Sequence, residues 1–296
     1  MIEQVRPVRA GVKPVSRMTG RRMDAGLIFK LGIAILWAVV VLFPLWWVFN
    51  VVFSPSGIPI ALNPRLYPSS LSAGIEKIAM VLAETDFLRA TVVTGLYAVV
   101  QIGGMLLLTS MAAYEFALFR FPGKDFLFLF ALSSLMVPPA VTIIPLFRIV
   151  AGLRWINTFA GLAVPGMASA FTLFIFRQFM EKLPRELIDA ASIDGAGHFG
   201  IWHRVIMPLC GNAVMAVTVW SFVTIWGNYL WPLVVISRPS MQTISLITAA
   251  VVGQRSWRTM DFAMATFFLA SIPPILVYLF LQRYIVQSVS LSGLKG

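Results

Sequence analysis

The residues best able to do chemistry lie in one polar stretch, ELIDAASIDGAGHFGIWHRVIMP, at positions 186–208. His198 and His203 are five residues apart with no adjacent glutamate, which fits neither the H-E-x-x-H motif nor a Cys/His zinc site. The chain also has no G-x-S-x-G sequence and no G-x-x-x-x-G-K-[ST] phosphate loop. We therefore expect no catalytic residue, metal site or bound cofactor, and we interpret both histidines as surface or interface residues.

The first half of this stretch has the pattern of a short helix that ends in a glycine turn. Pro184 suits the first helical position, and Glu186 and Asp189 suit the positive N-terminal end of a helix. Helical spacing also relates Leu187, Ala190, Ala191 and Asp194. Gly195 can then adopt the left-handed backbone conformation that closes a helix.

A second, amphipathic segment follows. We expect Phe199, Trp202 and Ile206 to share one of its faces before Pro208. Eight of the 28 residues from 177 to 204 are charged, which is typical of a segment in water. Two short helices around a glycine turn suit insertion into a groove of a partner protein. A solvated loop that only links its neighbours fits these residues equally well, because amphipathic loop helices are common.

The rest of the chain must position this stretch. The composition of the whole chain indicates a membrane protein. Hydrophobic residues make up 59% and charged residues 12%, against about 45–50% and about 25% in soluble domains. Six uncharged stretches can cross a bilayer at about 20 residues per helix: 31–64, 90–114, 126–147, 155–176, 205–237 and 262–282. We predict an all-α polytopic membrane protein with six transmembrane helices.

The remaining segments complete the predicted domain organisation. Residues 239–254 begin at a proline and are too short for a span, so we expect an interfacial or re-entrant segment. The apolar run after the basic arm exceeds the 7–15 residues or so of a signal peptide, so we expect it to stay uncleaved. The domains are a basic arm at 1–26, a six-helix transmembrane domain at 27–290 that contains the loop 177–208, and a tail at 291–296.

Lysine and arginine predict the orientation in the membrane. With the N-terminus inside, the inner segments hold fifteen of these residues and the outer segments eight, so both termini should face the cytoplasm. The net charge of +11 is explained by this bias and by contact with the lipid bilayer, and no nucleic-acid partner is expected. Cys210, the one cysteine, is expected to be a small buried side chain.

None of the six predicted spans contains Asp, Glu, Lys or Arg. Ion-coupled carriers usually need such groups inside the membrane, which favours a driving force applied from outside the bilayer. A secondary transporter driven by an ion gradient and a membrane scaffold subunit nevertheless remain alternatives. Prolines interrupt four spans, which predicts either moving joints or static kinks. They are Pro44 in the first span, Pro138-Pro139 and Pro145 in the third, Pro165-Gly166 in the fourth and Pro273-Pro274 in the sixth.

The polar stretch resembles the EAA loop of ABC-importer permeases, whose pattern is E-A-A-x3-G-x9-I-x-L-P. This chain has Asp189-Ala190-Ala191, three residues, Gly195, nine residues, Val205, one residue and then Met207-Pro208. The spacing matches throughout. Three positions differ in residue type, namely Asp189 for Glu, Val205 for Ile and Met207 for Leu.

Five further strings resemble the carbohydrate-uptake branch of that family, typified by the smaller permease of the maltose transporter. They are FRFPGK at 119–124, VPPAVTIIPLF at 137–147, Asn157-Thr158, WGNYLWPL at 226–233 and SGLKG at 292–296. Because these strings occur in the family's order around a correctly spaced loop, the resemblance covers nearly the whole chain.

The resemblance implies the type I permease fold in a bacterial inner membrane. It implies that the chain forms half of a pore with a second, non-identical permease, that two ATPase subunits carry ATP and Mg, and that an extracytoplasmic solute-binding protein delivers a carbohydrate. The tail would reach towards the ATPase. The residues implied to couple to the ATPase are Glu186, Asp189, Ala190, Ala191, Asp194, Gly195, Val205, Met207 and Pro208.

The fifth predicted span contains a candidate path for substrate. Its residues are Ser221, Thr224, Trp226, Asn228 and Tyr229. Aromatic faces beside hydrogen-bonding groups can contact sugar rings. Polar side chains inside a span also join helices to one another, so both interpretations stay open for these five residues.

Overall fold

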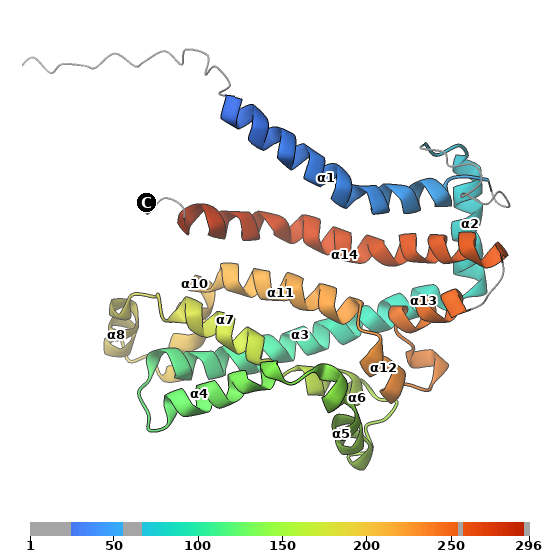
Figure 1. The fold of residues 1–296 in the computed structure, drawn as a ribbon. Coiled ribbons are helices and arrows are strands. Elements are labelled where there is room, and N and C mark those ends of the chain that lie inside the picture. The colour runs from blue at the N-terminus through green and yellow to red at the C-terminus, as the bar shows by residue number, and fades with distance from the viewer. Residues whose placement is uncertain (1–24, 56–66, 254–256, 293–296) are drawn as a thin grey trace, which may run out of the picture. The chain divides into compact units, whose positions relative to one another are not determined.

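The computed structural model describes residues 25–55, 67–253 and 257–292, and within these ranges every regular element is a helix (Figure 1). The chain divides into two units, residues 1–47 and 48–296. Their boundary lies inside the first helix, α1 (Ala25–Val52). The predicted arm at 1–26 and tail at 291–296 lie largely outside the described residues.

Among the described residues, three helices are long and apolar enough to cross a membrane without a break. They are α1, α3 (Phe87–Leu118) and α14 (Trp257–Ser292), which agree with the first, second and sixth predicted spans. Helix α1 ends at Val52, and residues 56–64 of the first predicted span lie outside the described residues. Both α1 and α14 remain helical through their prolines, at Pro44 and at Pro273-Pro274.

The other three predicted spans are bent helix pairs rather than continuous helices. The third joins α4 (Lys124–Ser133) and η1 (Ser134–Met136) to α5 (Pro139–Gly152) at 105°. The fourth joins α6 (Phe159–Ala163) and η2 (Val164–Gly166) to α7 (Ala170–Met180) at 46°. The fifth joins His198–Leu209 to α11 (Gly211–Trp226) at 77°. The predicted number of six therefore holds only when each pair counts as one span.

Prolines account for two of these breaks. Pro138 precedes α5 and Pro139 is its first residue, and a proline disfavours helical backbone in the residue before it. Pro165 lies in the 3-10 turn between α6 and α7, where its missing N–H cannot continue the helix. The joints or kinks predicted at Pro138-Pro139 and Pro165 are therefore present as breaks. The fifth span bends where no proline predicted it, because the chain turns at Cys210 and again after Trp226.

The stretch 239–254 does not form a span, as predicted. It contains η4 (Pro239–Met241) and the ten-residue helix α13 (Ile244–Gly253), and it follows the short helix α12 (Leu230–Val235). Helix α13 lies beside α3 and α14, with Ile244, Ile247 and Val251 buried. It is thus part of the packed core.

Helix α2 (Leu71–Glu84), which no sequence pattern had predicted, lies beside α14. Ser70 caps α2 because its hydroxyl accepts a hydrogen bond from Ala73 N at 3.2 Å. The core of the second unit is organised around α3, which lies beside α7, α11 and α13. One end of α3 and α7 carries the polar stretch with α8 (Arg185–Ile193), as Figure 1 shows.

Candidate functional site

The polar stretch forms a helix that is closed by a complete glycine cap. After α8, Asp194 is the C-cap and Gly195 has φ +80°. Gly195 N donates to Ser192 O at 3.1 Å, and Ala196 N donates to Ala191 O at 3.0 Å. These are the two hydrogen bonds of a Schellman motif, so the predicted role of Gly195 in closing the helix is confirmed. Pro184 is the N-cap, one position before the predicted one.

Helix α8 keeps most of its surface exposed, and none of its side chains is fully buried. Leu187 is 43% and Ile193 is 86% exposed. Glu186, Asp189 and Ala190 are exposed as well. Large apolar side chains left open beside acidic ones suit a contact with another protein.

The two alanines of the motif do not face the same way. Ala190 is exposed, whereas Ala191 is partly buried and packs with Ile188 against the core. Successive residues of an α-helix are turned by about 100°, so Ala190 lies on the outer face of α8 and Ala191 lies towards the core while staying partly accessible. A contact of both alanines with a partner stays a prediction.

The second segment contains a π-helix. Its elements are α9 (His198–Ile201), η3 (Trp202–Ile206) and α10 (Met207–Leu209). Met207 N donates to Trp202 O, five residues back, and Pro208 has no N–H with which to continue an α-helical ladder. Such single-turn π-helices recur at functional sites.

The predicted common face of the second segment is only partly correct. Trp202 and Ile206 are buried, but Phe199 is 63% exposed although its ring lies 5.3 Å from that of Trp202. Val205 and Met207 are half-buried against the core, while Pro208 is exposed. Val205 and Met207 therefore support the loop from the core side. Pro208 is the most accessible of the last three motif positions.

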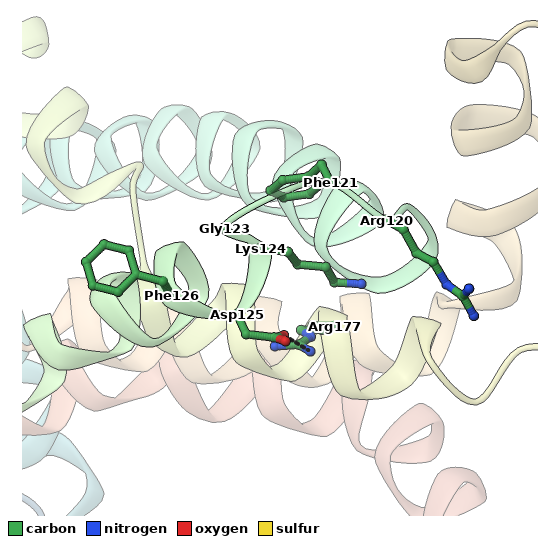
Figure 2. A pocket seen from close by; sticks show the side chains of 7 residues that line it. All are labelled: Arg120, Phe121, Gly123, Lys124, Asp125, Phe126 and Arg177. Atoms are coloured by element: carbon green, nitrogen blue, oxygen red, sulfur yellow. Dashed lines mark ion pairs between the residues drawn. The ribbon is translucent and has the colours of Figure 1, made fainter.

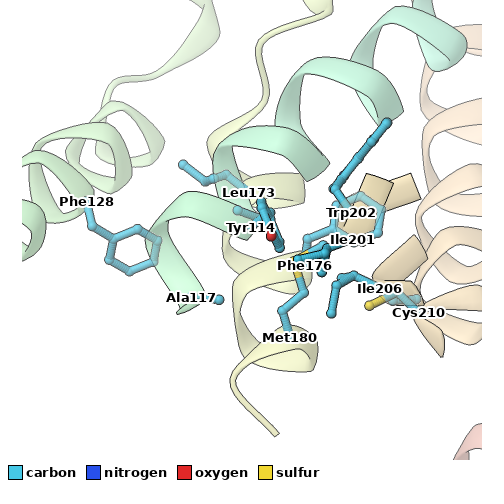
Figure 3. Close-up of a cluster of buried hydrophobic side chains, with 12 residues drawn as sticks. Tyr114, Ala117, Phe128, Leu173, Phe176, Met180, Ile201, Trp202, Ile206 and Cys210 are labelled. Atoms are coloured by element: carbon cyan, nitrogen blue, oxygen red, sulfur yellow. The ribbon is translucent and has the colours of Figure 1, made fainter. Parts of the chain in front are cut away.

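A buried hydrophobic cluster fixes this segment to the helices behind it (Figure 3). Tyr114 and Ala117 come from α3, and Phe176 and Met180 from α7. The π-helix contributes Trp202 and Ile206, and Cys210 is 1% exposed, as predicted for a small buried side chain. A displacement of the loop would thus be transmitted to α3 and α7 through close-packed side chains.

A cavity of about 400 Å³ lies between α8 and the end of α3. Arg185, Asp189 and Ser192 line it from α8, and His198 and Phe119 line it from the neighbouring segments. The rings of His198 and Phe119 are 4.8 Å apart. Spacing along α8 could have identified the first three residues, but no sequence signal connects them to His198 or Phe119.

The five candidate substrate-path residues lie in different environments. Ser221 is buried, and its Oγ lies 3.7 Å from Met105 Sδ. Trp226 is buried, and its Nε1 donates to Ala270 O at 2.9 Å. Asn228 is half-buried, with Nδ2 3.5 Å from Tyr97 Oη. Thr224 and Tyr229 are exposed, so contact with a substrate stays a prediction that these two side chains fit best.

Within the described residues, no group of three or more His, Cys, Asp or Glu side chains is placed to hold a metal ion. In the same part of the chain, no ion pair involves Glu186, Asp189 or Asp194. The site therefore consists of an exposed helix with acidic and apolar side chains, packed on a buried hydrophobic cluster. Such a surface can bind a partner.

Comparison with known proteins shows which family this chain resembles in sequence. Residues 105–291 match the family described as "Binding-protein-dependent transport system inner membrane component". The sn-glycerol-3-phosphate transport system permease protein UgpE of Brucella melitensis is 34% identical over 288 residues, which are 93% of this chain and 96% of UgpE. The arabinooligosaccharides transport system permease protein AraQ of Halalkalibacterium halodurans is 33% identical over 191 residues, 64% of this chain and 68% of AraQ.

A solved structure has the same fold. It is described as a bacterial ABC transporter involved in the import of the acidic polysaccharide alginate. The TM-score is 0.74 at 20% sequence identity, and the match covers 90% of this chain and 99% of that one. The match shows that this chain and that one share a fold over nearly their whole lengths.

Proposed function

This chain belongs to the family of binding-protein-dependent transport system inner membrane components, and we propose that it is a permease subunit of an ATP-driven carbohydrate importer. It forms half of a pore with a second, non-identical permease. Two ATPase subunits bind ATP and Mg beneath it, and an extracytoplasmic binding protein delivers the solute. As a multi-pass membrane protein of the bacterial inner membrane, it holds both termini in the cytoplasm.

The relatives support a hydroxyl-rich solute. UgpE is named for sn-glycerol 3-phosphate and AraQ for arabinooligosaccharides. Membership of the family speaks against the alternatives of an ion-coupled carrier and a scaffold subunit. We expect Thr224 and Tyr229, which are exposed, to meet the solute, while Ser221 and Trp226 hold α11 against its neighbours.

The observation that carries the proposal is the exposed helix α8 on its buried cluster. Its outer face, with Glu186, Asp189, Ala190 and Ile193, docks in a cleft of an ATPase subunit as a coupling helix. When the ATPase pair closes on ATP, α8 moves with it. The cluster passes that movement to α3 and α7, which rocks the permease between two states.

Purification of the tagged chain from its host membrane tests this assignment. An ATPase and a second permease should copurify, and the substrate-loaded binding protein should stimulate ATP hydrolysis. The ligand retained by that binding protein identifies the solute. Transport by the chain alone, driven by an ion gradient, would contradict the proposal.

The orientation has its own test. A reporter inserted after Lys124 or at His198 should be cytoplasmic, and one near Ser70 should be external. The reason is the excess of lysine and arginine in the inner segments. An external signal at His198 would rule out the coupling role of α8.

A further inference from the structure

A second cavity, of about 410 Å³, lies where the chain turns from α3 into α4 (Figure 2). Arg120, Lys124 and Arg177 line it together with one carboxylate, that of Asp125. Three cations around one anion leave an excess of positive charge. The coupling role proposed for α8 makes no use of this cavity.

Arg177 is already engaged by other side chains. Its guanidinium lies 2.7 Å from Glu181 Oε1, 3.8 Å from Asp125 Oδ1 and 3.8 Å from the centre of the Phe128 ring. Its side chain is 15% exposed, so it forms the inner wall of the cavity. The dashed line in Figure 2 marks its ion pair with Asp125.

Arg120 and Lys124 supply the uncommitted charge. Lys124 Nζ donates one hydrogen bond, to Phe119 O at 2.9 Å, and an ammonium group has three donors. Arg120 is exposed and makes no ion pair within the described part of the chain. In Figure 2 its guanidinium points away from Asp125 and Arg177. Both cations are therefore free to meet an anion from outside.

The backbone adds hydrogen-bond donors. Gly123 has φ +79° and is the N-cap of α4, so the first turn of this ten-residue helix begins at the cavity. Lys124 N donates to Phe121 O at 3.3 Å. The N–H groups of the next two residues belong to a first helical turn, where such groups lack partners within the helix and favour an anion. Asp125 and Phe126, which belong to that turn, line the cavity.

The helix that leads away from the cavity is strongly apolar and exposed. Phe126 is 71%, Leu129 67% and Phe130 68% exposed, and the rings of Phe126 and Phe130 stack with centres 6.4 Å apart. In a membrane-spanning chain, a basic cavity followed at once by such a surface lies at the boundary between water and hydrocarbon. A ligand there would have a charged head and an apolar tail.

We propose that this cavity binds the phosphate headgroup of an anionic phospholipid. Arg120, Lys124 and the first turn of α4 hold the phosphate, and the acyl chains lie along the exposed face of α4. Basic pockets at the cytoplasmic ends of transmembrane helices bind acidic headgroups in this way. The Asp125 carboxylate repels the phosphate and so lowers the affinity of the cavity for the lipid.

Native mass spectrometry tests the proposal on the full chain with the subunits that copurify with it. The protein is released in the spectrometer from nanodiscs that contain equal amounts of phosphatidylglycerol and phosphatidylcholine. The number of molecules of each lipid that stay bound to the protein is measured. Arg120→Gln and Lys124→Gln should each lower the retention of phosphatidylglycerol about fivefold, as expected for one cation near an anionic headgroup. Asp125→Asn should raise it, a gain that misfolding cannot produce.

The matched control is Lys182→Gln, which removes one positive charge from an exposed residue outside the cavity. It should retain phosphatidylglycerol as the unaltered chain does. Equal retention in Arg120→Gln and Lys182→Gln would overturn the proposal. Inorganic phosphate should not displace the lipid, and displacement by it would instead assign the cavity to a free anion.

Discussion

Helix α2 carries a charged side chain that is buried and paired, whereas the charged side chains of α8 are exposed. Lys77 on α2 has 5% of its side chain exposed, and its Nζ donates to Val51 O at 3.1 Å and to Ser54 O at 2.7 Å. It also lies 3.6 Å from Asp261 Oδ2 on α14. On α8, by contrast, Glu186 and Asp189 are exposed and form no ion pair within the described residues.

The buried charge of Lys77 stabilises the fold, whereas the exposed charges of Glu186 and Asp189 can contact a partner protein. Burial lowers the pKa of the Lys77 ammonium, and the nearby Asp261 carboxylate acts in the opposite direction. A buried pair that loses one partner destabilises a protein strongly, whereas an exposed charge contributes little to stability. The acidic groups of α8 therefore remain available for a contact with another protein.

The largest effect on stability is expected at Lys77. Lys77→Met leaves Asp261 and two backbone carbonyls without their partner, which should cost about 3 kcal/mol in the free energy of unfolding. The measurement is thermal unfolding of the purified protein in detergent. Lys182→Met, at an exposed lysine without an ion pair in the described part of the chain, is the control and should unfold as the unaltered chain does. Equal stability of both variants would show that the buried pair does not hold α2.

The next largest effect is expected at the glycine turn. Gly195→Val places a β-branched residue at φ +80° and should strain the turn by about 1–2 kcal/mol. An added Cβ meets nothing within 4 Å, so the backbone alone causes the effect. Membrane abundance and pairing with the second permease should stay normal, while ATP hydrolysis loses its stimulation by the loaded binding protein.

Gly197 provides a matched control in the same loop. Its φ is −70°, and an added Cβ there also meets nothing within 4 Å. Gly197→Val should therefore keep the stimulated ATP hydrolysis. If Gly195→Val and Gly197→Val transport equally well, the left-handed turn is not needed for coupling.

A smaller effect is expected from a charge reversal on α8. Asp189→Lys should weaken binding of the ATPase by up to about fivefold, the range for one carboxylate near a helix N-terminus. Pull-down of the ATPase at increasing salt measures it. Glu84→Lys, an exposed acid on α2, makes the same change in net charge and should have no effect. Equal binding by both variants would remove Asp189 from the interface.

The smallest effect concerns two buried tryptophans. Trp202 Nε1, beneath α8, has no hydrogen-bond partner among the described residues. Trp226 Nε1, in the cluster that also contains Val52 and Val81, donates to Ala270 O. Trp226→Phe should therefore cost about 1 kcal/mol more than Trp202→Phe in the free energy of unfolding. Equal costs would mean that Trp202 has a partner as well.

Much of the fold could be predicted because hydropathy and helix-ending signals act locally. The apolar runs predicted the number of spans when the bent pairs are counted as single spans. The glycine after α8 was identifiable, since few other residues adopt positive φ without strain. Pro138-Pro139 and Pro165 predicted two of the bends, but α1 and α14 continue through their own prolines, so the prolines alone did not show which spans are broken.

The sequence by itself determined which stretches are apolar, where α8 ends and which residues form the EAA-like motif. Tertiary structure decided which of those residues face outward. Packing against α3 and α7 turned Ala191, Val205 and Met207 inward and left Asp189 exposed. It also brought Asp261 to Lys77, although the two residues are far apart in the sequence. Periodicity specifies the relative angle of two side chains on one helix, but only the neighbouring helices specify which side of that helix is buried.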